Sequence, residues 1–314
     1  MEERASGGLH PIVCASAGMA RCGTDAQLAG VGHPHDAQSW RTALDHRLPI
    51  PMASHPVTYS SYLRLDELLE LQTPLSDGPE HDEMLFIVVH QAYELWFKQI
   101  LHEIDRMQVL LTQNDTTRVR HALKRVLTIL KVLVAQIDIL ETMTPVEFLT
   151  FRDRVESGSG FQSYQFRGLE FAMGNKRLQA VEHYPADSAA RAWLQDRYER
   201  PTIWDAFLAY LARAGHAVPE AQLTRDVRAP IEPSPALQRL LLDIYRTDAV
   251  QRELCERLVD LDEGVQEWRY RHVKMVERTI GGKPGTGGSA GAAYLVRTLM
   301  KPAFPDLWEI RSEL

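Results

Sequence analysis

Two histidines stand out because each lies in the middle of a long, largely apolar stretch with helical spacing. His90 lies in the segment from about 82 to 112, and His272 in the helical region that opens at Ser234. An imidazole on an apolar helix face needs a hydrogen-bond partner, a metal or a ligand, since burying it unpaired costs a few kcal/mol. Each could be an ordinary core histidine bonded to a backbone group, which is the commoner arrangement, or the two could face one bound group.

The spacing around these histidines is poor for zinc and compatible with haem. Glu94, four residues after His90, is the single further ligand type at that spacing from either histidine. Zinc takes three or four protein ligands, whereas haem iron needs one and a pocket of apolar side chains. One imidazole on the iron and one on the opposite face would fit, and two unrelated core histidines remain the alternative.

Arg152 is the next polar group on an aromatic face, beside Phe148 and Phe151. A buried guanidinium needs a carboxylate or a phosphate and prefers to bind it with two parallel hydrogen bonds. A nearby acid, Asp153 or Glu170, could supply an internal ion pair. The carboxylate of a small molecule would serve equally well.

A glycine-rich loop covers residues 285–291 and could bring backbone N–H groups close to a ligand. It lacks the Gly-Lys-Ser/Thr ending of a phosphate-binding P-loop, and no strand pattern precedes it. Thr286 could offer its hydroxyl to an ammonium or carboxylate group. For the loop alone, a flexible linker is the favoured interpretation.

Composition excludes several classes of protein. The chain has 314 residues, of which 45% are hydrophobic, and a net charge of -7 with both signs mixed along it. This argues against a nucleic-acid-binding surface or a basic membrane patch, and no apolar run is long enough to span a membrane. Three cysteines without CxxC spacing favour a reducing cytoplasm and offer no zinc site.

The apolar periodicity predicts an all-α fold: a helical bundle with long core helices, plus a small peripheral helical subdomain. Residues 1–57 are predicted to be a disordered extension, and 58–314 one domain with a peripheral helical insertion at 176–232. A short helix is expected over 59–69. Further helices are expected over about 82–112, 116–142, 145–152, 161–171, 204–213 and 235–280, the last with a break near Asp248.

Six segments together resemble the tryptophan 2,3-dioxygenase family. They follow one another in the family's order over residues about 58 to 310, and six in order are far more specific than any one. The segments are YSSYLRLDELL (59–69), HDEMLFIVVHQ with ELW (81–91, 94–96), FRD (151–153), SGFQS with QFR (159–163, 165–167), WRYRH (268–272) and GTGGSAG (285–291).

The resemblance implies a role for each matching residue. His272 would be the proximal haem ligand and His90 the distal histidine that meets the indole N–H. The substrate-binding positions would be Phe86 and Phe148 as pocket walls, Arg152 on the substrate carboxylate, Thr286 on its ammonium and carboxylate end, and Tyr59, Tyr62 and Leu63 as the segment that completes a neighbouring subunit's pocket. Phe148 and Phe166 stand where some relatives carry tyrosine, so those two positions offer no hydroxyl for a hydrogen bond.

The resemblance also implies the reaction and the assembly. Long core helices would enclose one haem b per subunit, ferrous in the active form. The enzyme would insert O2 across the indole C2–C3 bond of L-tryptophan, giving N-formyl-L-kynurenine in the first step of tryptophan catabolism through kynurenine. A cytoplasmic homotetramer, a dimer of dimers, is expected. A haem sensor without turnover and a cofactor-free helical scaffold are the competing interpretations.

Overall fold

The computed structural model describes residues 56–155, 158, 160–285, 295–296 and 299–314. The chain divides into two compact units, Met1–Tyr62 and Leu63–Leu314, which are described separately. The predicted disordered extension over 1–57 falls almost entirely outside the described residues. It therefore stays a prediction, as does the domain boundary at residue 58.

The segment expected to form one short helix forms two. Helix α2 covers Tyr59–Leu63 and helix α3 covers Leu65–Leu69. Arg64 separates them in the left-handed region, with φ of 52°, a conformation that breaks a helix. Thr58 precedes α2, and its hydroxyl accepts a hydrogen bond from the backbone N–H of Ser61 at 3.2 Å. Neither helix buries a residue.

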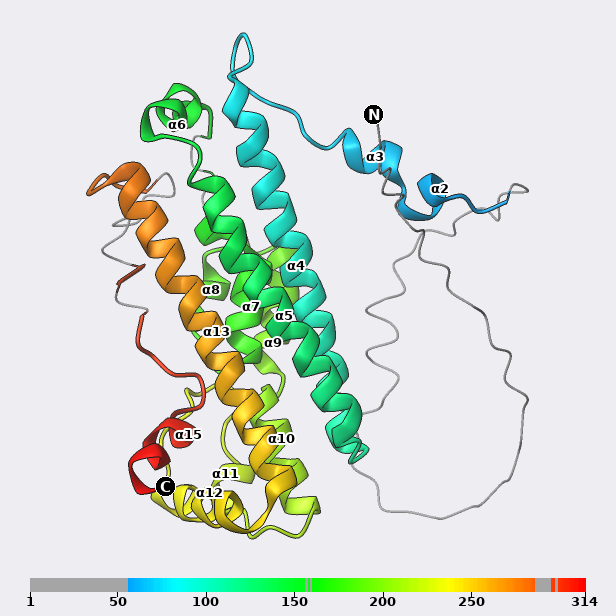
Figure 1. The fold of residues 1–314 in the computed structure, drawn as a ribbon, viewed down its shortest axis with the longest axis vertical. Helices are drawn as coiled ribbons and strands as arrows, with labels where there is room; N and C mark the ends of the chain where they lie inside the picture. The colour runs from blue at the N-terminus through cyan, green and yellow to red at the C-terminus, as the bar shows by residue number, and fades with distance from the viewer. Residues whose placement is uncertain (1–55, 156–157, 159, 286–294, 297–298) are drawn as a thin grey trace, which may run out of the picture. The chain divides into compact units, whose positions relative to one another are not determined.

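Three long helices form the centre of the larger unit. They are α4 (His81–Thr112), α5 (Thr116–Leu140) and α13 (Ala249–Ile280). Helix α5 packs along both α4 and α13, as Figure 1 shows. Its first turn is capped by Asp115, whose carboxylate accepts from the N–H of Arg118 at 3.0 Å. The predicted bounds of these helices are confirmed to within about two residues.

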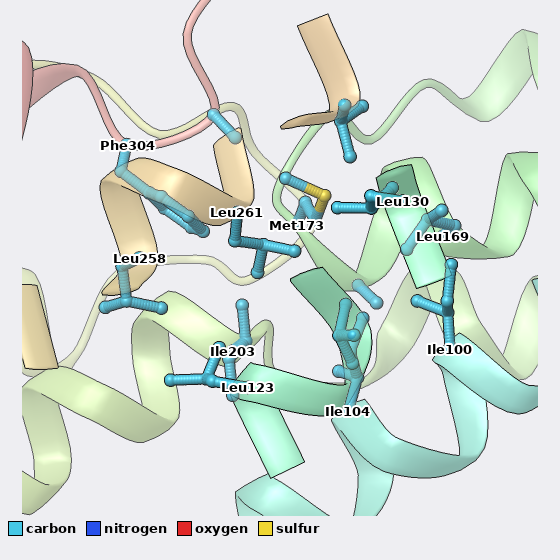
Figure 2. Close-up of a cluster of buried hydrophobic side chains, with 14 of the residues drawn as sticks. Ile100, Ile104, Leu123, Leu130, Leu169, Met173, Ile203, Leu258, Leu261 and Phe304 are labelled. Carbon is cyan, nitrogen blue, oxygen red and sulfur yellow. The ribbon is translucent and has the colours of Figure 1, made fainter. Parts of the chain in front are cut away.

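The core between these helices is aliphatic at its centre. Figure 2 shows the side chains that meet there, drawn from the three long helices and their neighbours: Ile100, Ile104, Leu123, Leu130, Leu169, Met173, Ile203, Leu258, Leu261 and Phe304. Gly264 lets α13 lie close to α5, since a Cβ at that position would stand 3.0 Å from the Cδ1 of Leu130. The central helices are therefore held at a fixed spacing, which positions whatever they carry.

Shorter helices continue the bundle. In the described part of the chain outside 176–232 they include α6 (Pro145–Phe151), followed by a 3₁₀ turn (Arg152–Val155), then α7 (Tyr164–Ala172), α12 (Pro235–Thr247) and α15 (Pro305–Glu309). The predicted break between α12 and α13 is confirmed at Asp248, whose side chain caps α13 by accepting from the N–H groups of Val250 and Gln251.

The region 176–232 is divided between the core and the periphery. It contains α8 (Leu178–Glu182), α9 (Ala189–Glu199), α10 (Ile203–Arg213) and α11 (Glu220–Leu223). Helix α10 packs on α4, and Trp204, Phe207 and Leu208 of α10 belong to the main core. Helix α9 packs on α7 instead and closes a second, smaller cluster around Phe171. Part of the predicted insertion is thus integral to the bundle.

The predicted all-α class is confirmed, because every regular element among the described residues is helical. None of the helices in the described ranges is both long and apolar enough to cross a membrane.

Candidate functional site

His90 is fixed on α4 in a single tautomer. Its Nδ1 lies 2.7 Å from the carbonyl oxygen of Phe86, one turn earlier. A carbonyl oxygen can only accept, so Nδ1 carries the proton and Nε2 keeps a free lone pair. Burial lowers the pKa of His90 below its ordinary value, since a charged imidazole is disfavoured away from water. His90 is therefore a neutral hydrogen-bond acceptor at physiological pH.

The imidazole of His90 lies against one ring of an aromatic cluster. The Phe86 ring lies with its centre 4.1 Å from that of His90. Phe148 and Phe151 of α6 complete the cluster, with centres 5.8 and 5.6 Å from Phe86 and 5.5 Å from each other. The structure thus brings together three residues that sequence analysis assigned to one pocket, Phe86, His90 and Phe148, and adds Phe151, which is fully buried.

His272 lies on α13 with its ring stacked on Trp268, at a centre distance of 5.3 Å and an interplanar angle of 15°. Its pKa is lowered to about 4, first by burial, then by the charge that His90 would carry, then by Arg167. The imidazole is therefore neutral at pH 7. The side chain is partly buried and no group among the described residues forms a hydrogen bond to its ring, so its nitrogen lone pair is open to a ligand or to water.

The two imidazoles lie within electrostatic reach of each other, because His90 is one of the causes of the low pKa of His272. They come from α4 and α13, the two helices that pack against α5. The long helices thus bring residues 182 positions apart in the chain close enough for their charges to interact.

Arg152 opens the 3₁₀ turn that follows α6. One of its terminal nitrogens, Nη2, donates to the carbonyl oxygen of Pro284 at 2.8 Å, and its buried Nε has no partner within the described part of the chain. Pro284 stands two residues before Thr286, which lies outside the described residues together with most of the glycine-rich loop. The ion pair of Arg152 with Glu170 that the sequence allowed is wrong, because the Glu170 carboxylate binds other arginines instead.

A buried cluster of charges around Glu170 was not anticipated from the sequence. Its carboxylate, only 4% exposed, accepts from Arg167 at 2.6 Å, Arg269 at 2.6 Å and Arg177 at 2.7 Å. Arg167 and Glu170 are spaced i, i+3 on a helix that also carries three aromatic residues, and this spacing was the one available signal. Arg269 is buried as well.

The remaining predicted site residues lie on α2, which straddles the boundary between the two units and is described by itself. Tyr59 is 77%, Tyr62 78% and Leu63 42% exposed. Such large apolar side chains gain free energy when they are covered. Exposure of this kind leaves these side chains available for contact with another chain.

Fold and site define a class: an all-helical protein in which two neutral imidazoles from separate helices approach each other beside an aromatic cluster and a guanidinium. This donor set suits a flat, largely apolar group with one nitrogen ligand better than it suits a zinc ion. In addition, no cluster of three or more potential metal ligands exists within the described ranges.

Comparison with known proteins identifies the family. The model of the tryptophan 2,3-dioxygenase family matches residues 49–203 and 234–314. A tryptophan 2,3-dioxygenase of Herpetosiphon aurantiacus is 58% identical over 261 residues, covering 83% of this chain and all of the relative. Those of Anaeromyxobacter sp. and Caulobacter vibrioides are 54% and 46% identical, covering 83% and 82% of this chain and 97% and 98% of the relatives. The chain belongs to the tryptophan 2,3-dioxygenase family.

The extent of the family match differs from the predicted bounds at the N-terminal end and in the middle of the chain. It begins at residue 49, before the 58 at which the resemblance was seen to start, and it is interrupted over 204–233. The interruption begins at Trp204, in the first turn of α10. The unmatched part is therefore shorter than the predicted insertion at 176–232 and includes a helix that contributes to the core.

Proposed function

We propose that the protein is a haem-dependent dioxygenase that cleaves the indole C2–C3 bond of L-tryptophan with O2 to give N-formyl-L-kynurenine, the first step of tryptophan catabolism through kynurenine. The family membership supports the reaction. The observation that carries the proposal is the state of His272: partly buried, neutral, without a hydrogen bond in the described residues, stacked on Trp268, and close enough to His90 for a charge there to lower its pKa.

The residues present fit one haem b per subunit, enclosed by the long core helices. His272 would hold the iron, because a neutral imidazole with a free nitrogen lone pair is a good ligand. Trp268 stacks on its ring and restricts its rotation. When bound and ferrous, the haem supplies the iron at which dioxygen reacts. The protein's own contribution is to bind and orient the amino acid.

His90 orients the substrate by one hydrogen bond. Its Nδ1 is occupied by the Phe86 carbonyl, so Nε2 faces the substrate as an acceptor. The indole N–H is a donor without an acceptor function, and the two match. Because the pKa of His90 is lowered, the ring stays neutral and does not present a competing donor.

Phe86 and Phe148 form the apolar walls of the substrate pocket. Their rings contact each other and the imidazole of His90 lies against Phe86, which makes a surface suited to a flat indole. Phe148 carries no hydroxyl, so this wall contributes shape and exclusion of water and leaves hydrogen bonding to His90.

Arg152 would bind the carboxylate of the amino acid, and Thr286 its ammonium and carboxylate end. The Nη2 atom of Arg152 bonds to Pro284, which holds the guanidinium at the start of the segment that contains Thr286. A charge-assisted pair selects an amino acid over plain indole. Holding the substrate at both ends orients the C2–C3 bond and lowers the barrier by several kcal/mol in favourable cases.

Assembly is part of the same proposal. The exposed side chains of Tyr59, Tyr62 and Leu63 on α2 would complete the pocket of a neighbouring subunit in a homotetramer arranged as a dimer of dimers. The enzyme would act in the cytoplasm.

The test is direct. Full-length protein, loaded with haem and reduced, is incubated with L-tryptophan in air, and the absorbance of N-formylkynurenine is followed. We expect product to accumulate with tryptophan and not with indole. A protein that takes up haem but forms no product would be a haem sensor or carrier, and a protein that takes up none would be a scaffold.

A further inference from the structure

The buried charges around Glu170 are connected to His272 through two routes. The first follows α13: Arg269, which donates to Glu170 at 2.6 Å, stands less than one turn before His272. The second is a column of rings, because Phe166 packs on Trp268 at 4.8 Å and Trp268 stacks on His272 at 5.3 Å. Both routes begin at the helix that carries Glu170.

The charges also bear on this column. The guanidiniums of Arg167 and Arg269 lie over the ring of Phe166, at 4.8 and 5.8 Å from its centre, a favourable cation–π geometry. Glu170 binds both guanidiniums and so fixes them over the ring. One carboxylate therefore joins α7, the segment after it through Arg177, and α13.

A buried cluster of charges contributes little net free energy to the stability of a fold. Removing charges from water costs several kcal/mol per ion, and well-packed apolar side chains often give as much stability. The benefit that an ionic cluster offers is a unique arrangement and a fixed electric field. A field matters most where a nearby group changes charge, as the iron of a haem does on reduction.

We propose that Glu170 is a positioning residue for His272: by binding three arginines it fixes the ring column against the proximal imidazole and sets the field at the iron. The inference rests on the proposed function and adds to it a determinant of the iron's reduction potential. Glu170 acts through Arg269, Arg167 and the rings, and needs no contact with substrate or haem.

The electric field of the charge cluster predicts the direction in which each substitution shifts the reduction potential of the haem. Glu170→Gln keeps the shape but removes a negative charge, which destabilises the more positive ferric state. The midpoint potential of the bound haem should shift to more positive values. Arg177→Gln removes one of the positive charges that bind the same carboxylate. Because 37% of the Arg177 side chain is exposed, this substitution disturbs the core less than Glu170→Gln does. Its midpoint potential should shift to more negative values.

Glu103→Gln is the matched control. Glu103 is equally buried, at 5% exposure, and also binds an arginine, Arg125, at 2.6 Å. It lies thirteen residues beyond His90 on α4, about 20 Å along the helix axis. Its substitution should lower the melting temperature and leave the potential unchanged.

The measurement is a redox titration of each haem-loaded protein, followed in its Soret band. Opposite shifts in Glu170→Gln and Arg177→Gln, with none in Glu103→Gln, are expected. Unchanged potentials in both, or a shift in Glu103→Gln of the same size, would overturn the role of Glu170 and leave the proposed function standing. Should Glu170→Gln not fold, the negative shift of Arg177→Gln decides alone. A wild-type protein without haem would overturn both proposals.

Discussion

The surroundings of His90 and those of His272 consist of different kinds of side chain. On the His90 side, the imidazole lies against Phe86 of an aromatic cluster, and within the described part of the chain its hydrogen bond goes to the carbonyl oxygen of Phe86 on its own helix. On the His272 side, a ring stack ends in buried charges that come from α7, α13 and the segment between α7 and α8. One side is apolar with one free acceptor, and the other is fixed by ions.

This difference suits two tasks. A pocket that must accept and release a flat substrate gains from an apolar wall and a few polar groups. A ligand that must hold one orientation gains from neighbours that cannot move independently, which ion pairs with several partners provide. The His90 side is therefore expected to determine substrate preference, and the His272 side to determine what the bound group does. Four predictions test this division.

The first concerns the proton on His272. Its folded-state pKa is about 4, against about 6.5 in the unfolded chain. Between these values the unfolded chain binds a proton that the folded chain excludes, so stability is present above pH 6.5 and lost as pH falls to 4. In haem-free protein this amounts to at most about 3 kcal/mol.

Urea denaturation at a series of pH values measures this effect. His272→Ala should show the weaker loss of unfolding free energy over this window. Equal pH dependence in wild type and variant would mean that the His272 side does not exclude the proton.

Arg152→Ala should raise the KM for L-tryptophan roughly 10- to 100-fold, because a charge-assisted hydrogen bond contributes about 1.5–3 kcal/mol. Arg154→Ala is the control, since Arg154 pairs with the exposed Asp77 at the surface. Steady-state kinetics on both variants separate the two. Equal KM values would place the carboxylate elsewhere.

Gly168→Ala tests how tightly the helix that carries Glu170 is held. A Cβ there would stand 2.4 Å from two atoms of the Trp193 ring, and overpacking of this kind costs about 1–3 kcal/mol. Thermal unfolding should show a lower melting temperature than in Gly160→Ala, where nothing lies within 4 Å of the new Cβ. An unchanged melting temperature would show that α7 and α9 separate easily.

His90→Phe should have the smallest effect, on discrimination alone. The preference for L-tryptophan over its 1-methyl derivative, which lacks the indole N–H, should fall about 2- to 10-fold, the value of one neutral hydrogen bond of about 0.5–1.5 kcal/mol. His102→Phe, at an exposed position on the same helix, should leave the ratio of kcat/KM values as it is. If His90→Phe leaves the ratio of kcat/KM values for the two substrates unchanged, His90 does not bind the indole N–H.

The apolar side of the site was readable from the sequence, and the charged side was not. Phe86 and His90 stand four residues apart and therefore share one helix face, and α12 and α13 were predicted with their break, because local periodicity and capping residues carry that information. The pairing of Glu170 with Arg269 joins residues 99 positions apart. Since any of the chain's 35 Lys and Arg residues could have been its partner, only the three-dimensional fold selects it.

The limits of α2 and α10 have similar causes. The single helix expected over 59–69 is broken at Arg64, which adopts the left-handed conformation. The segment contains no glycine or proline from which this break could be predicted. Helix α10 was assigned to a peripheral insertion because of the polar, proline-punctuated sequence around it. Its own apolar face, with Trp204 and Phe207, packs into the main core.

The central claim is that His272 and His90 lie on opposite faces of one haem, with His272 as the iron ligand and His90 as the acceptor for the substrate's indole N–H. It is tested most directly by the haem content of two variants purified in parallel, measured from the Soret absorbance per protein chain. His272→Ala should lose the haem, while His90→Ala should retain it. Full haem content in His272→Ala, or its loss in His90→Ala alone, would contradict the account.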